Sequence, residues 1–96
     1  MVGDEGVLEV ELLGPLRAEA GGSPSLRLRV RGRAKLLEVL EMLPPRVRER
    51  VLRDGGVAPG ILILVNGVEV TVLGGVEEVS VGERDRVTLI PIIHGG

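Results

Sequence analysis

The sequence predicts an α+β protein, in which a mixed sheet of four to five strands carries one main helix and one short helix on the same face. Three observations support this prediction. Two segments near the N-terminus alternate apolar and charged residues, the next segment has helical spacing, and apolar runs follow it. We expect residues 1–96 to form a single domain, because this length supplies one hydrophobic core.

The first two predicted strands are residues 7–13 and 26–31. In the first, apolar residues alternate with glutamate, and in the second they alternate with arginine. A period of two is typical of a strand with one buried face. Residues 18–25 between them are rich in Gly, Ser and Pro, so we expect a loop there. The two strands should therefore pair as an antiparallel hairpin.

The arginines of the second strand allow two interpretations. Arg27, Arg29 and Arg31 could bind RNA or an acidic partner, or they could be neutralised across the hairpin by Glu9 and Glu11. The net charge of −2 disfavours a general role in nucleic-acid binding. We favour neutralisation, because charge runs are usually solvated faces.

Residues 33–43 have the apolar spacing i, i+3, i+4, i+7 of an amphipathic helix, at Leu36, Val39, Leu40 and Leu43. The two prolines that follow end this helix, since neither can donate a backbone hydrogen bond. The second of them can begin a short helix over residues 46–53, which Gly55 and Gly56 would end.

Apolar runs dominate the second half of the chain. Residues 61–65 form the most apolar run, and we place this strand at the centre of the sheet. Asn66 and Gly67 favour a type I′ turn, so residues 68–72 should fold back as the next strand.

The last predicted strand is residues 87–93, after a loop over residues 73–85 with at most one short strand. In such a roll, a terminal strand through the middle of the sheet would project its end from one edge. We therefore expect residues 94–96 to form a protruding tail.

Composition excludes several kinds of site. The chain has no cysteine and one histidine, His94, so a cysteine zinc site, a thiolate nucleophile and a Ser-His-Asp triad are not available. We expect no bound metal and no side-chain catalysis. The apolar run at residues 61–65 is too short to cross a membrane, and acidic residues near Met1 argue against a secretory signal. A cytoplasmic location is the simplest expectation.

The balance of polar residues also suggests heat stability. Lys35 is the one lysine among 12 basic residues, Asn66 is the one asparagine, and glutamine is absent. Scarce amides and abundant arginine and glutamate suit a thermophilic protein. A GC-rich genome would favour arginine and glycine equally well.

Two motifs in the second half resemble the β-grasp family of ubiquitin-like sulfur carriers, the MoaD and ThiS group, and the related archaeal small modifiers. Residues 63–70, Ile-Leu-Val-Asn-Gly-Val-Glu-Val, resemble the strand–Asn–Gly–strand hairpin of the family. Residues 82–96 resemble its closing segment, which reads Gly82-x-x-Asp85-Arg-Val87-x-x-x-Pro91-x-x-x-Gly95-Gly96. In element order the resemblance covers nearly the whole chain and implies the β-grasp roll.

The resemblance places the chemistry at the Gly96 carboxylate. A MoeB- or ThiF-like activating enzyme would adenylate it with ATP, and a sulfur donor would convert it to a thiocarboxylate. Gly95, His94 and Ile93 would bind the partner enzymes, and Asp85 would turn the chain into the last strand. The favoured function is that of the small subunit of molybdopterin synthase, which would insert its tail into a larger, MoaE-like subunit. No cofactor would be bound.

Two alternatives stay open. The chain could be a protein modifier conjugated through Gly96 to lysines of other proteins, in which case Lys35 would be its one internal branch point. It could instead be an interaction or RNA-binding module in which the diglycine is incidental. A partner should also contact an apolar patch near the last strand. Val87, Leu89 and Ile93 are candidates, although such strand residues are more often core.

Overall fold

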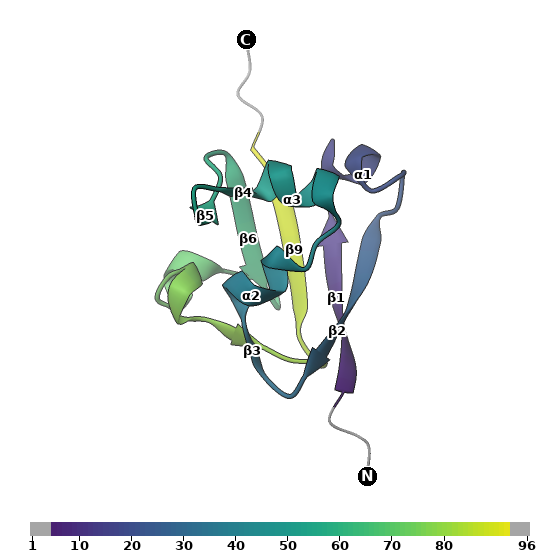
Figure 1. Ribbon diagram of the computed structural model, residues 1–96. Helices are drawn as coiled ribbons and strands as arrows, with labels where there is room; N and C mark the ends of the chain where they lie inside the picture. The colour runs from purple at the N-terminus through teal and green to yellow at the C-terminus, as the bar shows by residue number, and fades with distance from the viewer. Residues whose placement is uncertain (1–4, 93–96) are drawn as a thin grey trace.

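Five strands form one mixed sheet in the computed structural model, which describes residues 5–92. Its order is β2-β1-β9-β6-β7. The strands are β1 (Glu5–Leu12), β2 (Ser25–Arg31), β6 (Ile61–Val65), β7 (Val68–Glu69) and β9 (Arg86–Pro91). The predicted hairpin of the first two strands is confirmed, and so is the predicted mixed sheet of four to five strands, which has five (Figure 1).

Strand β9 lies at the centre, parallel to β1 and antiparallel to β6. Two rows of buried side chains cross these three strands, Val10–Val87–Val65 and Leu12–Leu89–Ile63. The prediction that residues 61–65 occupy the centre is wrong, because β6 lies one place nearer the edge. An apolar run indicates that both faces of a strand are covered, whereas its position depends on pairing with distant segments.

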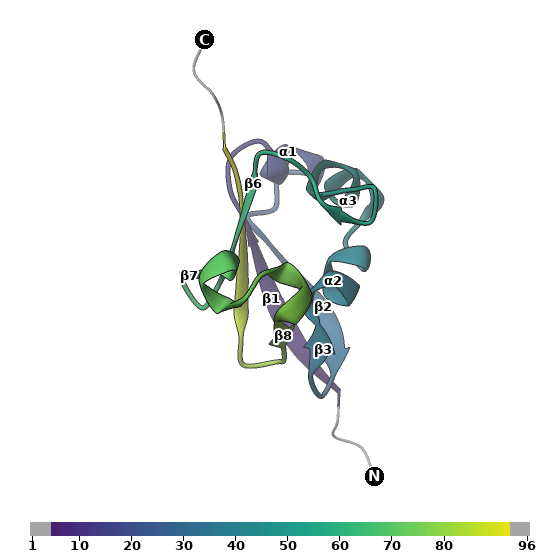
Figure 2. The same ribbon diagram turned by 90° about the vertical axis from the view of Figure 1, so that its left-hand side faces the viewer.

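Helices α2 (Leu36–Glu41) and α3 (Pro45–Val51) cover one face of the sheet (Figures 1 and 2). The main helix begins three residues later than predicted. Ala34 and Lys35 instead form β3, which pairs with β8 (Ser80–Val81), and the Leu36 N–H donates to the Val79 carbonyl at 2.9 Å. A tertiary contact therefore overrides the helical pattern at this end.

A short helix, α1 (Leu16–Glu19), lies at the start of the region predicted as loop. Leu16 is buried in the core, and Arg17 Nε donates to the Leu12 carbonyl at 2.8 Å. Four residues are too few to show helical periodicity, so the sequence pattern could not reveal this element.

The second predicted helix ends at Val51 rather than at Arg53. Leu52–Arg53 form β4 and pair with β5, Gly56–Val57. The loop between them is Asp54-Gly55, and both residues have positive φ, 53° and 81°. Asp-Gly is a strong hairpin signal, which the interpretation of the glycines as a helix stop overlooked.

The turn at Asn66 and Gly67 is confirmed, with φ of 52° and 84°. The strand after it is shorter than predicted, because residues Val70–Leu73 form a 3-10 helix, η1. The Glu69 carboxylate accepts hydrogen bonds from the N–H and the hydroxyl of Thr71, and these bonds cap the start of η1. A second 3-10 helix, η2 (Val76–Glu78), precedes β8.

Gly67→Ala should cost about 1 kcal/mol of folding free energy, because Gly67 has a positive φ that is unfavourable for alanine. A Cβ there would meet no other atom within 4 Å, so a steric clash would add nothing to this cost. Gly56→Ala is the matched control, since its site is equally open and its φ lies outside the left-handed range. Urea unfolding of both variants measures the difference. Equal stability of the two variants would contradict the turn geometry.

The core fills the space between the sheet and the two longer helices. It consists of aliphatic side chains alone, and the largest of those that are fully buried are Leu8, Leu12, Leu36, Leu40, Leu43, Ile63 and Leu89. Within residues 5–92, no helix is long and apolar enough to cross a membrane.

Candidate functional site at the end of the central strand

The central strand is held on the β1 side as far as Leu89 and on the β6 side as far as Ile92, the last described residue. The Leu13 N–H donates to the Leu89 carbonyl at 3.1 Å, and the Ile92 N–H donates to the Gly60 carbonyl at 2.6 Å. The residues predicted to carry the function are Ile93, His94, Gly95 and Gly96, and all four lie outside the described residues. What the structure does position is the point from which they continue.

A hollow of about 340 Å³ lies beside Ile92. Three of the chain's six prolines, Pro15, Pro59 and Pro91, converge on it from separate segments. Proline fixes φ, so these residues form a stiff frame around the end of β9. The remaining lining residues are Leu16, Glu49, Arg50, Arg53, Ala58, Gly60 and Ile61.

Arginines of α3 and β4 dominate the charge around this hollow. Glu19 of α1 pairs with two of them, at 3.1 Å from Arg50 Nε and 3.7 Å from Arg46 Nε. The side chains of Arg46 and Arg50 stay 83% and 60% exposed in these pairs. Within the described residues Arg53 has no ion pair, so the end of the molecule beside Ile92 presents positive charge to solvent.

The beginning of β9 is fixed by Asp85. Its carboxylate accepts from Asn66 Nδ2 and the Gly82 N–H, both at 2.8 Å, and from Arg33 Nη1 at 3.2 Å. Asn66 Oδ1 in turn accepts from the Arg86 N–H at 2.9 Å. This network joins the two motifs of the sequence, the Asn-Gly turn and the segment before the last strand. The predicted role of Asp85 in turning the chain is confirmed.

These contacts lower the pKa of Asp85 below its ordinary value of 3.8. The hydrogen bond from Asn66 is the largest cause, burial opposes it, and the Gly82 N–H and the Arg33 charge add to the lowering. Between the lowered and the ordinary pKa, the unfolded chain binds more protons than the folded one, so stability rises with pH there. The contribution of Asp85 is fully present above the ordinary pKa and is lost in acid.

Asp85→Asn should cost about 1–3 kcal/mol at neutral pH, because an amide nitrogen cannot accept from Gly82 or Arg33. The loss of stability as the pH falls through and below the ordinary pKa of 3.8 should also become shallower than in the wild type. Urea unfolding across this range measures both effects. Glu77→Gln, at an exposed carboxylate, is the control, and an Asp85→Asn curve parallel to that of the control would contradict the role of Asp85.

The face of the sheet opposite the helices carries a second hollow, of about 610 Å³. Leu64 and Ile90 are half-buried in its lining, and the buried Thr88 hydroxyl donates to Glu11 Oε1 at 3.2 Å. Of the predicted patch, Val87 and Leu89 are fully buried on the other face, so the core interpretation of these two is confirmed. Ile90 and Ile92 alternate with these two residues along the chain, and they are half-buried and exposed, respectively.

The same face bears the arginines of β2. Arg27 lies opposite Glu9, which also lies opposite Arg86 on its other side. The register therefore places Glu9 between two arginines, which is the arrangement that neutralisation across the strands requires. Glu11 lies opposite Ser25 instead of an arginine, so its expected role was wrong.

The model of the ubiquitin related modifier family, Urm1, matches residues 23–96 of this chain. The chain belongs to the Urm1 family. Its fold is the β-grasp, ubiquitin-like fold, as predicted, and both motifs that suggested it lie within the matched residues. No curated protein sequence matches significantly.

Solved structures of similar proteins agree with membership of the Urm1 family. The Haloferax volcanii HVO 2177 protein has a TM-score of 0.80 at 27% identity, covering 100% of this chain and 92% of its own. Small archaeal modifier protein 1 from Methanosarcina acetivorans gives 0.78 at 27% identity, covering 98% and 100%. A chain of the Amycolatopsis orientalis BexX/CysO complex gives 0.77 at 26% identity, covering 93% and 99%.

The described residues of this Urm1-family chain offer little chemistry of their own. Among residues 5–92, no group of three or more His, Cys, Asp or Glu could hold a metal ion. The buried polar side chain Thr88 is hydrogen-bonded to Glu11. The candidate site therefore consists of the end of β9 and two surfaces of the domain. One is the basic surface near Ile92, and the other is the hollow on the open face of the sheet, where Leu64 and Ile90 lie among polar and charged residues.

Proposed function

We propose that this protein is a sulfur carrier whose Gly96 carboxylate is adenylated and then converted to a thiocarboxylate. The observation that supports this most is the path of β9. The strand runs through the centre of the sheet and is held by β1 as far as Leu89 and on the β6 side as far as Ile92, after which the chain continues into residues 93–96. The family match also extends to Gly96.

The chemistry proceeds at the carboxylate and not at a side chain. A Gly96 carboxylate oxygen attacks the α-phosphorus of ATP in the activating enzyme, and pyrophosphate leaves. Sulfide from a donor then attacks the carbonyl carbon of the acyl-adenylate, and AMP leaves with its bonding electrons. The thiocarboxylate that remains can be handed to an acceptor. Two terminal glycines lack side chains that would obstruct entry into a narrow channel.

The partners we propose are a MoeB- or ThiF-like activating enzyme and, as acceptor, a larger MoaE-like subunit of molybdopterin synthase, all in the cytoplasm. Four residues beyond Ile92 span at most about 14 Å when extended. A partner must therefore approach the body of the protein closely. Ile90 and Leu64 on the open face provide an apolar contact for it. A relative crystallised as the BexX/CysO complex is consistent with such binding.

Intact-mass measurement tests the carrier function. The protein is incubated with ATP, sulfide and an extract of its own cells, beside a variant that lacks Gly95 and Gly96. We expect a mass gain that equals exchange of one oxygen for sulfur, in the intact chain alone. The starting mass also checks that Gly96 is the terminal residue. No tail-dependent product would argue against the proposal.

The second candidate is a protein modifier, which the description of the matching family and the name of the Methanosarcina acetivorans relative both favour. In this case a lysine amine of a target attacks the activated Gly96 carbonyl and forms an isopeptide bond. The same incubation separates the two functions. Larger conjugates that carry the C-terminal peptide of this chain on lysine would support the modifier.

A further inference from the structure

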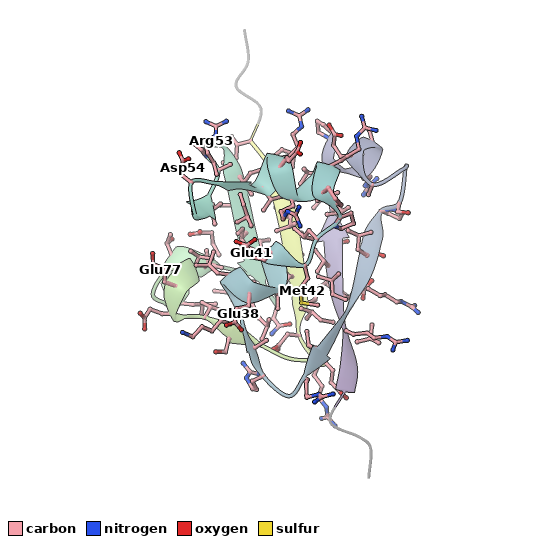
Figure 3. All side chains as sticks on the ribbon, viewed as in Figure 1. Glu38, Glu41, Met42, Arg53, Asp54 and Glu77 are labelled. Carbon is pink, nitrogen blue, oxygen red and sulfur yellow. The ribbon has the colours of Figure 1, made fainter. Side chains whose placement is uncertain are left out.

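Positive charge is concentrated at the end of the molecule where Ile92 lies, from which residues 93–96 continue. Residues 45–53 contain four arginines and one glutamate, a net charge of +3, although the whole chain has a net charge of −2. Arg53 lies near that end at the β4–β5 hairpin, with Asp54 beside it, whereas Glu38, Glu41 and Glu77 lie lower in the same view (Figure 3). We call Arg46, Arg50 and Arg53 the arginine surface.

We propose that the arginine surface docks on an acidic surface of the activating enzyme, around the entrance of the channel that receives residues 93–96. This inference rests on the proposed function, because it concerns the encounter that precedes adenylation. It goes further by naming the residues that meet the enzyme and the charge they meet.

Geometry places these arginines where the enzyme must come. Arg50 and Arg53 line the same hollow as Pro91 and Ile92. Since the four residues beyond Ile92 reach at most about 14 Å, the rim of the channel must come close to this hollow during adenylation. The long arginine side chains then lie within reach of the rim.

Folding gives no sufficient reason for so many arginines at this place. Arg46 and Arg50 share the single carboxylate of Glu19 and remain largely exposed, and such surface pairs contribute roughly 0–1 kcal/mol. Arg53 is exposed and has no ion pair among the described residues. Both facts leave positive charge available to a partner.

An acidic protein surface fits this region better than RNA does. Single-stranded nucleic acid is usually bound by aromatic side chains that stack on the bases, and the chain contains no Phe, Tyr or Trp. Glu19 and Glu49 lie among the arginines and would repel a phosphate backbone. A folded protein holds its acidic groups at fixed positions, which can lie opposite the arginines, because interfaces are complementary in charge.

ATP–pyrophosphate exchange tests the proposal. The adenylating enzyme is first purified from the cells by following its exchange activity with the wild-type chain. The rate is measured at several salt concentrations for Arg53→Gln, for Glu49→Gln, which changes the charge of the same hollow in the opposite direction, and for Arg27→Gln on β2 as a distant control. Unfolding curves confirm that all variants fold.

At low salt, kcat/KM should fall about threefold in Arg53→Gln and rise by a similar factor in Glu49→Gln, with kcat unchanged, because charges at a rim act mainly on association. Arg27→Gln should match the wild type. The differences should shrink toward 1 M salt, where the screening length is about 3 Å.

Two results would overturn the proposal alone: equal kcat/KM in all variants, or binding of a single-stranded oligonucleotide by the wild type that Arg53→Gln abolishes. If the cells yield no enzyme that catalyses exchange with the wild-type chain, the proposed function fails and this inference fails with it. The wild-type measurement therefore distinguishes the two failures.

Discussion

Removal of Gly95 and Gly96 is expected to abolish adenylation and leave the fold intact. The reacting carboxylate is carried by Gly96 in the proposed function, so the variant lacks the atom that attacks ATP. Within residues 5–92, main-chain bonds hold β9 and the chain after it as far as Ile92, and the deletion leaves all of these bonds in place. ATP–pyrophosphate exchange measures the loss, and a urea unfolding curve measures the fold.

A chain extended by one alanine after Gly96 is the matched control for this deletion. It keeps every native residue but moves the carboxylate onto a residue with a side chain. We expect no exchange from it either. Adenylation of the truncated chain at the wild-type rate would contradict the proposal, because the adenylated carboxylate would then not be that of Gly96.

The second large effect is expected at the centre of the sheet, where Leu89→Ala should destabilise the protein by about 2–5 kcal/mol. Leu89 is fully buried on β9 and lies opposite Leu12 and Ile63 on the two neighbouring strands. Truncation there leaves a cavity that rigid strands on both sides cannot close. Since native proteins have stabilities of about 5–15 kcal/mol, a large part of the total would be lost.

Ile90→Ala is the control for this substitution, because the two residues are adjacent on one strand but face opposite sides of the sheet. Ile90 is half-buried on the open face, so its truncation should cost less than that of Leu89. Urea unfolding of both variants gives the comparison. Equal losses would mean that β9 does not have the register and central place described above.

Local patterns in the sequence accounted for much of the sheet. Alternation of apolar and charged residues identified β1 and β2, and the Asn66-Gly67 pair identified the turn after β6, because both signals depend on neighbours along the chain. Elements of two to four residues, such as α1 and β3, were missed. Their stability comes from contacts with distant segments, as the pairing of Lys35 with Ser80 shows.

For the candidate site too, one part could be predicted from local sequence and the other part became apparent only in the structure. The closing motif pointed to Gly96 and gave Asp85 its role as a turn residue, which the hydrogen bonds from Asn66 and Gly82 confirm. The arginines of residues 46–53 were visible in the sequence only as part of a helix. Their position beside Ile92 became apparent once α3 and the end of β9 were seen to share one hollow.

The sequence by itself determined the α+β class, which follows from periodicity, and the resemblance to β-grasp carriers and modifiers, which follows from two motifs at fixed spacing. The tertiary structure alone decided that β9 rather than β6 occupies the centre, which of its residues face the core, and where the positive charge gathers. The reason is physical: strand order, facing and surface charge depend on pairings between segments many residues apart, and no local pattern encodes such a pairing.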